Sequence, residues 1–216
     1  MPHLTRLRPS PRRPGRTELF LDGVFLCRIP TEAIRHRGLA KGSELAPEEV
    51  EELREAGRRC EAADRALRYA AGRPRSRFQV ERHLRRAGYG EGAVRAAVER
   101  CVQAGHLDDR EFAAAFARDR IRLRPRSLAL LEAELRERGV DRSDARAGIA
   151  RALEEEVVTE EELLRRAAAK GWRRLRSAAP EQAKRRLYGY LSRRGFRAAE
   201  VRAAVERLAG PPGGLD

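Results

Sequence analysis

Positively charged side chains gather at four places in this 216-residue chain, and their type and spacing suit the binding of anions. A guanidinium group can form paired hydrogen bonds to a phosphate or a carboxylate, so each group predicts a contact with a polyanion or an acidic protein surface. The groups are Arg73, Arg75 and Arg77; Arg120, Arg122, Arg124 and Arg126; Lys170, Arg173, Arg174 and Arg176; and Lys184, Arg185, Arg186, Arg193 and Arg194.

The residue patterns of known catalytic sites are not found in the sequence. The four histidines are scattered, no serine lies in a nucleophile elbow, and there is neither a glycine-rich phosphate loop nor an H-E-x-x-H motif. Asp108, Asp109 and Glu111 form a small acidic group that could hold a metal ion. At the start of a helix, such residues more often cap the helix and complement its dipole. We therefore expect a protein that is not an enzyme and that uses no metal and no cofactor.

The composition favours an acidic or polyanionic partner. The net charge is +14, and the excess is concentrated in residues 1–16, which carry +5, and in residues 159–216, which carry +7. Only three of the 47 basic residues are lysines, a bias that a GC-rich genome would also produce. With 41% hydrophobic but only 5% aromatic residues, the core must pack through Leu, Val and Ala. That composition suits a thin stacked array of helices.

Cysteine usage and hydropathy indicate the compartment. Cys27, Cys60 and Cys101 are odd in number and far apart, so a disulfide framework or a C-x-x-C metal site is not available, and each is expected to be a small buried apolar residue. No apolar run is long enough to span a membrane, and no apolar segment follows the basic N-terminus as in a signal peptide. We expect a cytoplasmic monomer without membrane contacts.

A glycine-centred pattern occurs three times along the chain. In each copy a leucine stands four residues before a glycine, a bulky residue follows the glycine, and two apolar residues stand six and ten positions after it. The glycines, Gly88, Gly139 and Gly195, are separated by 51 and 56 positions, a spacing typical of stacked repeats. The apolar members are Leu84, Tyr89, Val94 and Val98; Leu135, Val140, Ala145 and Ile149; and Leu191, Phe196, Val201 and Val205.

The spacing predicts two helices joined by a glycine turn. A helix that ends near the leucine needs a residue with positive φ just beyond its end, and glycine adopts that conformation without a Cβ clash. The residues four apart after the turn would then line one face of the next helix. With a further helix before each leucine, the pattern predicts a mainly α protein whose tandem three-helix repeats form a curved, elongated array.

The rest of the chain divides around these repeats. We expect residues 1–16 to be a disordered basic arm, with or without a binding partner, because arginine and proline dominate it. Residues 17–57 should form a β-hairpin that turns at Asp22-Gly23 and packs on a helix from Pro47, with a domain boundary and a soft hinge at Gly57. The expected repeats and flexible tail occupy 58–107, 108–157, 158–210 and 211–216.

The basic groups lie at the connection between the first and second helices of each repeat. In a stacked array, equivalent connections line one edge, so these groups predict a basic stripe that the set from Lys184 to Arg194 would extend. The alternative is that exposed connections in any basic protein carry arginines without a shared role. Among the aromatic residues, only Trp172 is expected to be exposed within the stripe; Tyr89, Phe112 and Phe196 should be in the core.

The order of these motifs resembles the RecX regulatory-protein family. The resemblance covers about Glu61 to Leu208, and its most specific part is Leu107-Asp108-Asp109-x-x-Phe112-Ala113. It departs from the family pattern at Gln79-Val80 and at Pro125-Arg126-Ser127. The other motifs are Ala66-Leu67 with Arg73-Pro74-Arg75-Ser76, the Leu84 to Gly88-Tyr89 turn, Glu134-Leu135-x-x-x-Gly139-Val140, and Tyr190-Leu191-x-x-Arg194-Gly195-Phe196.

The resemblance implies a protein that binds the filament of the RecA recombinase along its helical groove. It further implies inhibition of ATP hydrolysis, strand exchange and coprotease activity by RecA, with weaker binding to single- and double-stranded DNA. Two other functions remain open at this point. The chain could be a direct DNA-binding protein, such as a transcriptional repressor acting through its basic stripe, or a structural adaptor without a nucleic-acid role.

Overall fold

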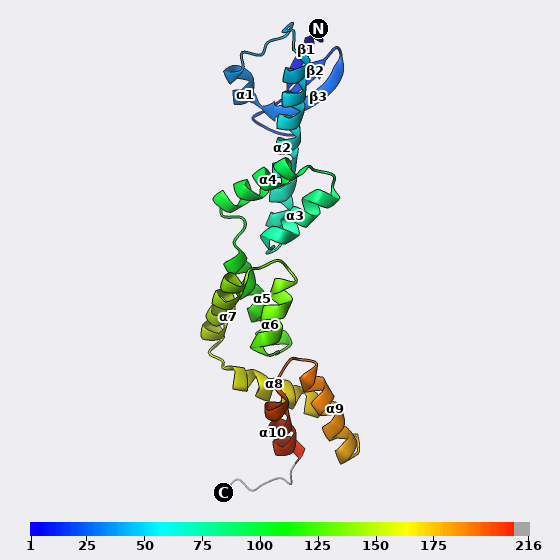
Figure 1. Ribbon diagram of the computed structural model, residues 1–216, viewed down its shortest axis with the longest axis vertical. Helices are drawn as coiled ribbons and strands as arrows, with labels where there is room; N and C mark the ends of the chain where they lie inside the picture. The colour runs from blue at the N-terminus through cyan, green and yellow to red at the C-terminus, as the bar shows by residue number, and fades with distance from the viewer. Residues whose placement is uncertain (210–216) are drawn as a thin grey trace. The chain divides into compact units, whose positions relative to one another are not determined.

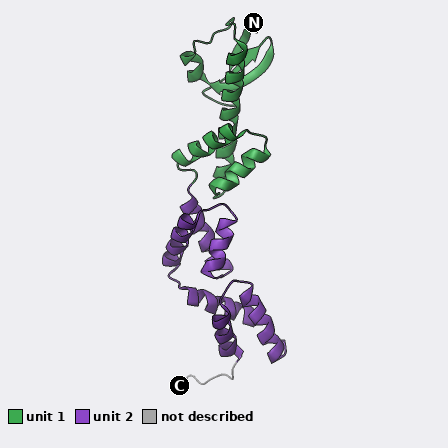
Figure 2. Ribbon diagram, viewed as in Figure 1, with its two compact units in different colours: residues 1–107 green, residues 108–216 purple. Residues whose placement is uncertain are grey.

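The computed structural model describes residues 1–209, and these fold into two compact units, residues 1–107 and the part that begins at Asp108 (Figure 2). Helices dominate both units, and a single small sheet lies in the first (Figure 1). This arrangement confirms the expectation of a mainly α protein with three-helix repeats. Within the described residues, no helix is both long enough and apolar enough to cross a membrane.

The sheet of the first unit is antiparallel, with its strands in the order of the chain. The strands are β1 (Leu4–Pro9), β2 (Arg16–Leu21) and β3 (Val24–Pro30). Asp22 and Gly23 join β2 to β3 with φ angles of 46° and 84°, so both turn residues have the positive φ of a type I′ turn. The expected hairpin is confirmed.

The expectation of a disordered arm over residues 1–16 is wrong. Residues 4–9 form β1, which pairs with β2, and Leu4 is completely buried. Leu4 and Leu7 pack against the core of the sheet region, while Arg6 and Arg8, on either side of Leu7, are exposed to solvent. The two leucines give the strand enough buried apolar surface to fold, although arginine and proline dominate the composition of residues 1–16.

A single long helix connects the sheet to the first repeat. The short helix α1 (Thr31–His36) precedes α2 (Pro47–Ala71), whose first half packs on β3 and whose second half belongs to repeat 1. The expected boundary and hinge at Gly57 are therefore wrong, because Gly57 lies inside α2. A Cβ at this position would stand 2.5 Å from the Cβ of Cys27, so glycine is needed for close contact between helix and sheet.

Repeat 1 is completed by α3 and α4 of the first unit. The second half of α2 packs mainly against α4, and its alanines Ala62, Ala63 and Ala66 belong to the buried cluster of repeat 1. Ser76 caps α3 by accepting a hydrogen bond from the backbone N–H of Gln79, as its sequence position predicts. The two helices span Arg77–Arg86 (α3) and Glu91–Gln103 (α4).

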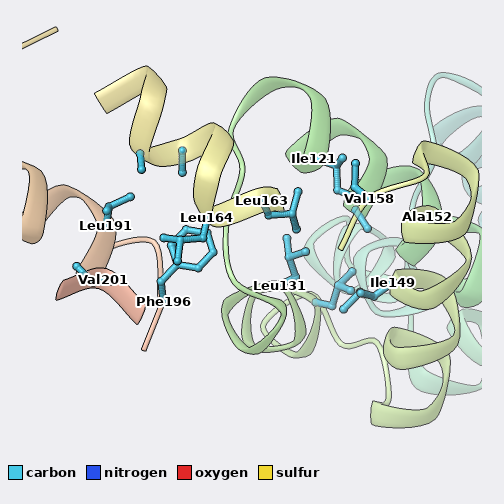
Figure 3. Packing of buried hydrophobic residues seen from close by; sticks show 14 of the residues in the cluster. Ile121, Leu131, Ile149, Ala152, Val158, Leu163, Leu164, Leu191, Phe196 and Val201 are labelled. Carbon is cyan, nitrogen blue, oxygen red and sulfur yellow. The ribbon is translucent and has the colours of Figure 1, made fainter. Parts of the chain in front are cut away.

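The second unit holds repeats 2 and 3, which share one apolar core. Ile121, Leu131 and Leu163, from the first and second helices of repeat 2 and the first helix of repeat 3, lie in a continuous buried cluster (Figure 3). Repeat 2 consists of α5 (Asp109–Leu123), α6 (Leu128–Arg136) and α7 (Arg142–Glu156), and repeat 3 of α8 (Glu160–Arg173), α9 (Pro180–Ser192) and α10 (Ala198–Ala209).

The glycine turns have the predicted geometry in all three repeats. Gly88, Gly139 and Gly195 have φ angles of 84°, 75° and 80°. In the first turn, the N–H of Tyr89 donates to the carbonyl oxygen of Leu84, the bond that closes a Schellman motif. The leucine before each glycine is completely buried, and so are the two apolar positions after it or nearly so. These apolar residues, inferred from the sequence around each glycine, are therefore residues that are buried in the fold.

Asp108 caps α5 by accepting hydrogen bonds from the backbone N–H groups of Arg110 and Glu111. The capping role inferred for the Asp108-Asp109 pair is thus confirmed for Asp108. Thr159 likewise caps α8, although Glu162 pairs with Arg165 and Arg166 instead of closing a capping box. The tail expected at residues 211–216 lies outside the described residues.

Candidate binding surface

The connection between the first and second helices of each repeat is called the elbow below. In the elbow of repeat 2, Arg120 and Arg126 fold inward toward Glu134 of α6. Arg126 forms an ion pair with Oε1 of Glu134, and Nε of Arg120 lies 3.5 Å from Oε2. The side chain of Glu134 is only 13% exposed. One carboxylate therefore balances two partly buried guanidinium groups at the base of this elbow.

A third arginine reinforces the positive charge around Glu134. Arg138 donates to the backbone carbonyl oxygen of Glu134, and its guanidinium lies 4.6 Å from the ring centre of Phe116. Arg120 lies over the same ring at 4.2 Å. Burial, together with the field of Arg120, lowers the pKa of Arg138. Arginine nevertheless remains charged at neutral pH, so the positive charge in this elbow exceeds the charge of Glu134.

The glycine turn of repeat 3 packs directly on the start of α6. The N–H of Ser127 donates to the carbonyl oxygen of Arg194 at 3.0 Å. A Cβ on Gly195 would stand 2.5 Å from Oγ of Ser127 and 2.8 Å from Cβ of Leu130. This close approach places the half-buried Arg194 beside the repeat 2 elbow.

Arg194 thereby joins a set of five arginines. Its guanidinium lies 3.9 Å from the ring centre of Tyr190, and burial is the main cause of its lowered pKa, with Arg174 and Arg124 adding to it. Burial also lowers the pKa of Arg126, with further contributions from its basic neighbours. We call the set around Glu134 the arginine cluster: Arg120, Arg124, Arg126, Arg138 and Arg194.

A second basic feature follows α9 of repeat 3. A groove of about 390 Å³ is lined by four exposed arginines together with the ring of Tyr190. Within residues 1–209, none of these arginines forms an ion pair with a carboxylate. We call this feature the α9 groove, and its arginines are Arg174, Arg185, Arg186 and Arg193. Its guanidinium groups are available to an external anion.

Besides Arg120 and Arg126, three further predicted contact residues are already engaged inside the molecule. Arg122 pairs with Glu156, which raises the pKa of Arg122, and Lys184 pairs with Glu181 at 2.6 Å. Lys170 donates to the backbone carbonyl oxygen of Leu123 near the end of α5. These pairs are at or near the surface, so an external anion would compete with them. Arg173 and Arg176 are exposed beside the α9 groove but do not line it.

The elbow of repeat 1 belongs to the first unit and has a different interior. Arg73 and Arg77 are exposed, whereas Arg75 is half-buried with its guanidinium 4.1 Å from the ring centre of Tyr69. Tyr69 in turn stacks on the imidazole of His83, with ring centres 3.9 Å apart. The stripe over all three elbows stays a prediction. What the structure brings together are the basic groups of repeats 2 and 3.

Comparison with known proteins supports one family throughout the repeats. Family models described as the first, second and third three-helix domains of RecX match residues 62–101, 108–149 and 159–205, together more than half of the chain. The chain belongs to the RecX family. The RecX family is a family of regulatory proteins, and the motifs that carried the resemblance lie in the matched segments, apart from Leu107, which directly precedes the second match.

Individual RecX proteins match over different lengths. The regulatory protein RecX of Chlorobaculum tepidum is 31% identical over 157 residues, which cover 71% of this chain and 92% of that protein. The regulatory protein RecX of Lactobacillus johnsonii is 27% identical over 140 residues, covering 65% of this chain and 51% of that protein. The chain therefore spans about half the length of the relatives from lactobacilli.

A crystal structure of a regulatory protein RecX shares the fold. It superimposes with a TM-score of 0.70 at 22% identity, covering 97% of this chain and 98% of the other. The similarity extends beyond the three helical domains matched by the family models. The sheet region is thus part of the fold shared with a solved RecX structure.

Sequence reasoning missed two members of the repeat 2 elbow and misplaced one ring. Glu134 and Arg138 were not singled out, although both lie close to the glycine of their RecX repeat and Glu134 is part of a family motif. Trp172 was expected to be exposed in the stripe, but it is half-buried and packs against the shared core of repeats 2 and 3. No described ring other than Tyr190 lines the α9 groove.

Proposed function

We propose that this RecX-family chain binds the filament formed by the RecA recombinase on single-stranded DNA and inhibits its activities. The inhibited activities would be ATP hydrolysis, strand exchange and the coprotease function. Membership of a family of regulatory proteins supports a binding role. The partner comes from the family resemblance, and the chemistry of the surface is consistent with it.

The observation that carries the proposal is the α9 groove. Four arginines line it without a carboxylate partner among the described residues, and the arginine cluster adds further positive charge nearby through Arg194, whose pKa the groove residue Arg174 helps to lower. Unpaired guanidinium groups around a concave surface bind carboxylates and phosphates through paired hydrogen bonds. A nucleoprotein filament offers both groups, acidic side chains from the protein and phosphates from the strand that it holds.

Direct binding to bare DNA is the second candidate. It is favoured by Lys184, Arg185 and Arg186, which are consecutive on α9, the last two being exposed. Such a run can contact successive phosphates without reading their bases. In this case the same residues would act on DNA alone, and inhibition of RecA would follow from competition for the strand.

A titration of the full chain separates the two candidates. RecA-coated single-stranded DNA and bare single-stranded DNA are titrated at the same ionic strength while ATP hydrolysis and DNA occupancy are followed together. If the chain acts on the filament, hydrolysis falls at concentrations that leave bare DNA unoccupied. Inhibition that appears only where bare DNA is saturated would contradict the proposal and support competition for DNA.

A further inference from the structure

The sheet of the first unit has two chemically different faces. One is apolar: Leu19, Cys27 and Ile29 are buried in the same cluster as Leu53 of α2 and Ile34 of α1. Both helices that contact the sheet therefore lie against this face. The opposite side chains point away from the helices, and we call their surface the outer face. It consists of Arg6 and Arg8 of β1, Glu18 and Phe20 of β2, and Phe25 and Arg28 of β3.

Cross-strand pairing brings these six side chains together. Arg6 pairs with Phe20 and Arg8 with Glu18 across the first two strands. Phe20 pairs in turn with Phe25, and Glu18 with Arg28, across β2 and β3. Residues paired in this way point to the same side of an antiparallel sheet and are close enough for their side chains to interact. The outer face is thus one contiguous patch built from three strands.

Two aromatic rings form the centre of the patch. The rings of Phe20 and Phe25 are in edge-to-face contact, with centres 5.7 Å apart. The guanidinium groups of Arg6 and Arg8 lie 5.7 Å and 5.6 Å from the ring centre of Phe20. Phe25 itself is 46% exposed. A phenylalanine that exposed on a sheet presents a flat apolar surface on which another ring can stack.

The charge of the patch is positive. Glu18 is its only carboxylate and is buried under Arg8 and Arg28, whose Nη2 atoms lie 2.5 Å and 3.0 Å from its oxygens. The hydrogen bond from Arg8 is the main cause that lowers the pKa of Glu18 to about 2, so Glu18 stays ionised. Three arginines against one carboxylate leave the patch with a net positive charge, and Arg6 forms no ion pair within the described residues.

We propose that the outer face binds single-stranded nucleic acid, with a base stacked on Phe25 and the backbone phosphates contacted by Arg6 and the flanking arginines. Exposed aromatic rings among arginines are what a single strand needs, because its unpaired bases can stack while its phosphates are neutralised. A duplex keeps its bases stacked inside and would leave Phe25 unused. An acidic peptide would engage the arginines but would gain nothing from the flat ring.

This inference does not depend on the action on RecA. It concerns a surface in the first unit, outside the segments that the RecX family models match, whereas the proposed function depends on arginines of the second unit. The sheet face can fail to bind DNA while the α9 groove still engages a filament. The reverse outcome is equally possible to measure, so the two proposals are tested separately.

Fluorescence anisotropy with a labelled oligothymidylate tests the proposal on the full chain. The starting protein carries Arg174→Glu, Arg185→Glu and Arg193→Glu, so that the α9 groove does not contribute to binding. In this background Phe25→Ala should weaken binding about tenfold, in line with the loss of one stacked base. Phe25→Tyr keeps the ring and should bind as before. Val24→Ala is the matched control, because Val24 is an adjacent exposed apolar residue outside the patch.

A second variant tests the phosphate contact. Arg6→Ala should reduce the dependence of log affinity on log salt concentration by about 0.7, the contribution of one phosphate contact to a single strand. Circular dichroism and the melting temperature verify that each variant folds. Equal affinities of the starting protein and Phe25→Ala would overturn the proposal. The absence of oligothymidylate binding would also overturn it. So would a result in which the same substitutions weaken the binding of poly-glutamate but leave the binding of the oligonucleotide unchanged.

Discussion

The elbows of repeat 1 and repeat 2 have the same backbone frame but are filled with different polar groups. In repeat 1 the filling is a stack of rings: the guanidinium of Arg75 lies over Tyr69, and Tyr69 lies parallel to His83 with an angle of 4° between the rings. His83 also accepts a hydrogen bond from Nε of Arg65 at 3.2 Å. No carboxylate takes part in this stack.

Repeat 2 replaces both rings of the stack and keeps its arginine, at positions 51 residues further along the chain. Tyr69 is replaced by Arg120 and His83 by Glu134, while Arg75 corresponds to Arg126. The ring stack thereby becomes an ionic network of two arginines and one glutamate. The two elbows show that the apolar frame fixes the backbone, whereas the polar filling can change between neutral and ionic without changing the fold.

The difference also explains where the free positive charge accumulates. The repeat 2 elbow receives the turn of repeat 3, which adds Arg194 to a network that already holds more arginines than carboxylates. The ring stack of repeat 1 contains one half-buried guanidinium, that of Arg75 over Tyr69. We therefore propose that the principal binding surface of the chain lies in the second unit.

The largest effect should come from removing the carboxylate of the ionic elbow. Glu134→Gln keeps the shape of the side chain but leaves Arg120 and Arg126 partly buried without a counter-charge, so we expect a loss of about 3 kcal/mol in the free energy of unfolding. Urea denaturation measures it. Glu154→Gln, at an exposed position of α7 away from the cluster, is the control and should be nearly neutral. A loss no larger than that of the control would show that the network is not needed for stability.

The packing between repeats 2 and 3 can be tested at the turns. Gly195→Ala and Gly88→Ala both force a side chain into positive φ, with similar strain. Only at Gly195 would the new Cβ also meet Ser127 and Leu130, while the space around Gly88 is open. We expect Gly195→Ala to lower the free energy of unfolding by about 2 kcal/mol more than Gly88→Ala does. Equal losses would contradict the close contact between the two repeats.

A smaller effect is expected when the elbow of repeat 1 is given the polar residues of the repeat 2 elbow. Tyr69→Arg and His83→Glu together convert the stack of repeat 1 into the ionic arrangement of repeat 2. Each single substitution should destabilise the chain, and the pair should recover part of the loss, with a coupling energy of about 1 kcal/mol in a double-mutant cycle. Additive losses would mean that the surroundings of the repeat 1 elbow do not accept an ion pair.

The smallest effect concerns pH. Burial, and then the nearby charges of Arg65 and Arg75, lower the pKa of His83 from its ordinary value of 6.5. Because the folded state disfavours the protonated ring, the contribution of His83 is fully present above the unfolded pKa and is lost as pH falls through and below 6.5. His83→Phe keeps a ring against Tyr69 without titrating. Thermal melts between about pH 7.5 and about pH 5 should show a steeper decline for the unsubstituted chain, and parallel declines would contradict this role.

The sequence predicted the frame of the repeats because that frame depends on local rules. The three glycines need positive φ, the leucines before them need burial, and Ser76 and Asp108 need only their own helix ends to act as caps. These requirements are visible in residue type and spacing. They also gave the sites of the first two elbows, which both end 12 residues before their glycine, whereas the third ends 16 residues before its glycine because α9 is longer.

The elements that sequence reasoning missed depend on contacts between distant segments. Strand β1 is stable because β2 and the apolar face cover Leu4, and position 57 inside α2 is a glycine because Cys27 of β3 approaches it closely. Likewise, whether an elbow arginine points to solvent or to Glu134 depends on a glutamate one helix away and on the turn of the next repeat. Spacing along the chain carries little of this information.

Charge reversal in the α9 groove is the most direct test of the proposal that this groove binds the RecA filament. Arg174→Glu combined with Arg193→Glu is compared with Arg136→Glu combined with Arg142→Glu, which makes the same change in net charge at exposed positions outside the groove. RecA-catalysed ATP hydrolysis on single-stranded DNA is measured with each folded variant. We expect that the groove variant no longer inhibits hydrolysis while the control inhibits like the unsubstituted chain. Full inhibition by the groove variant would contradict it.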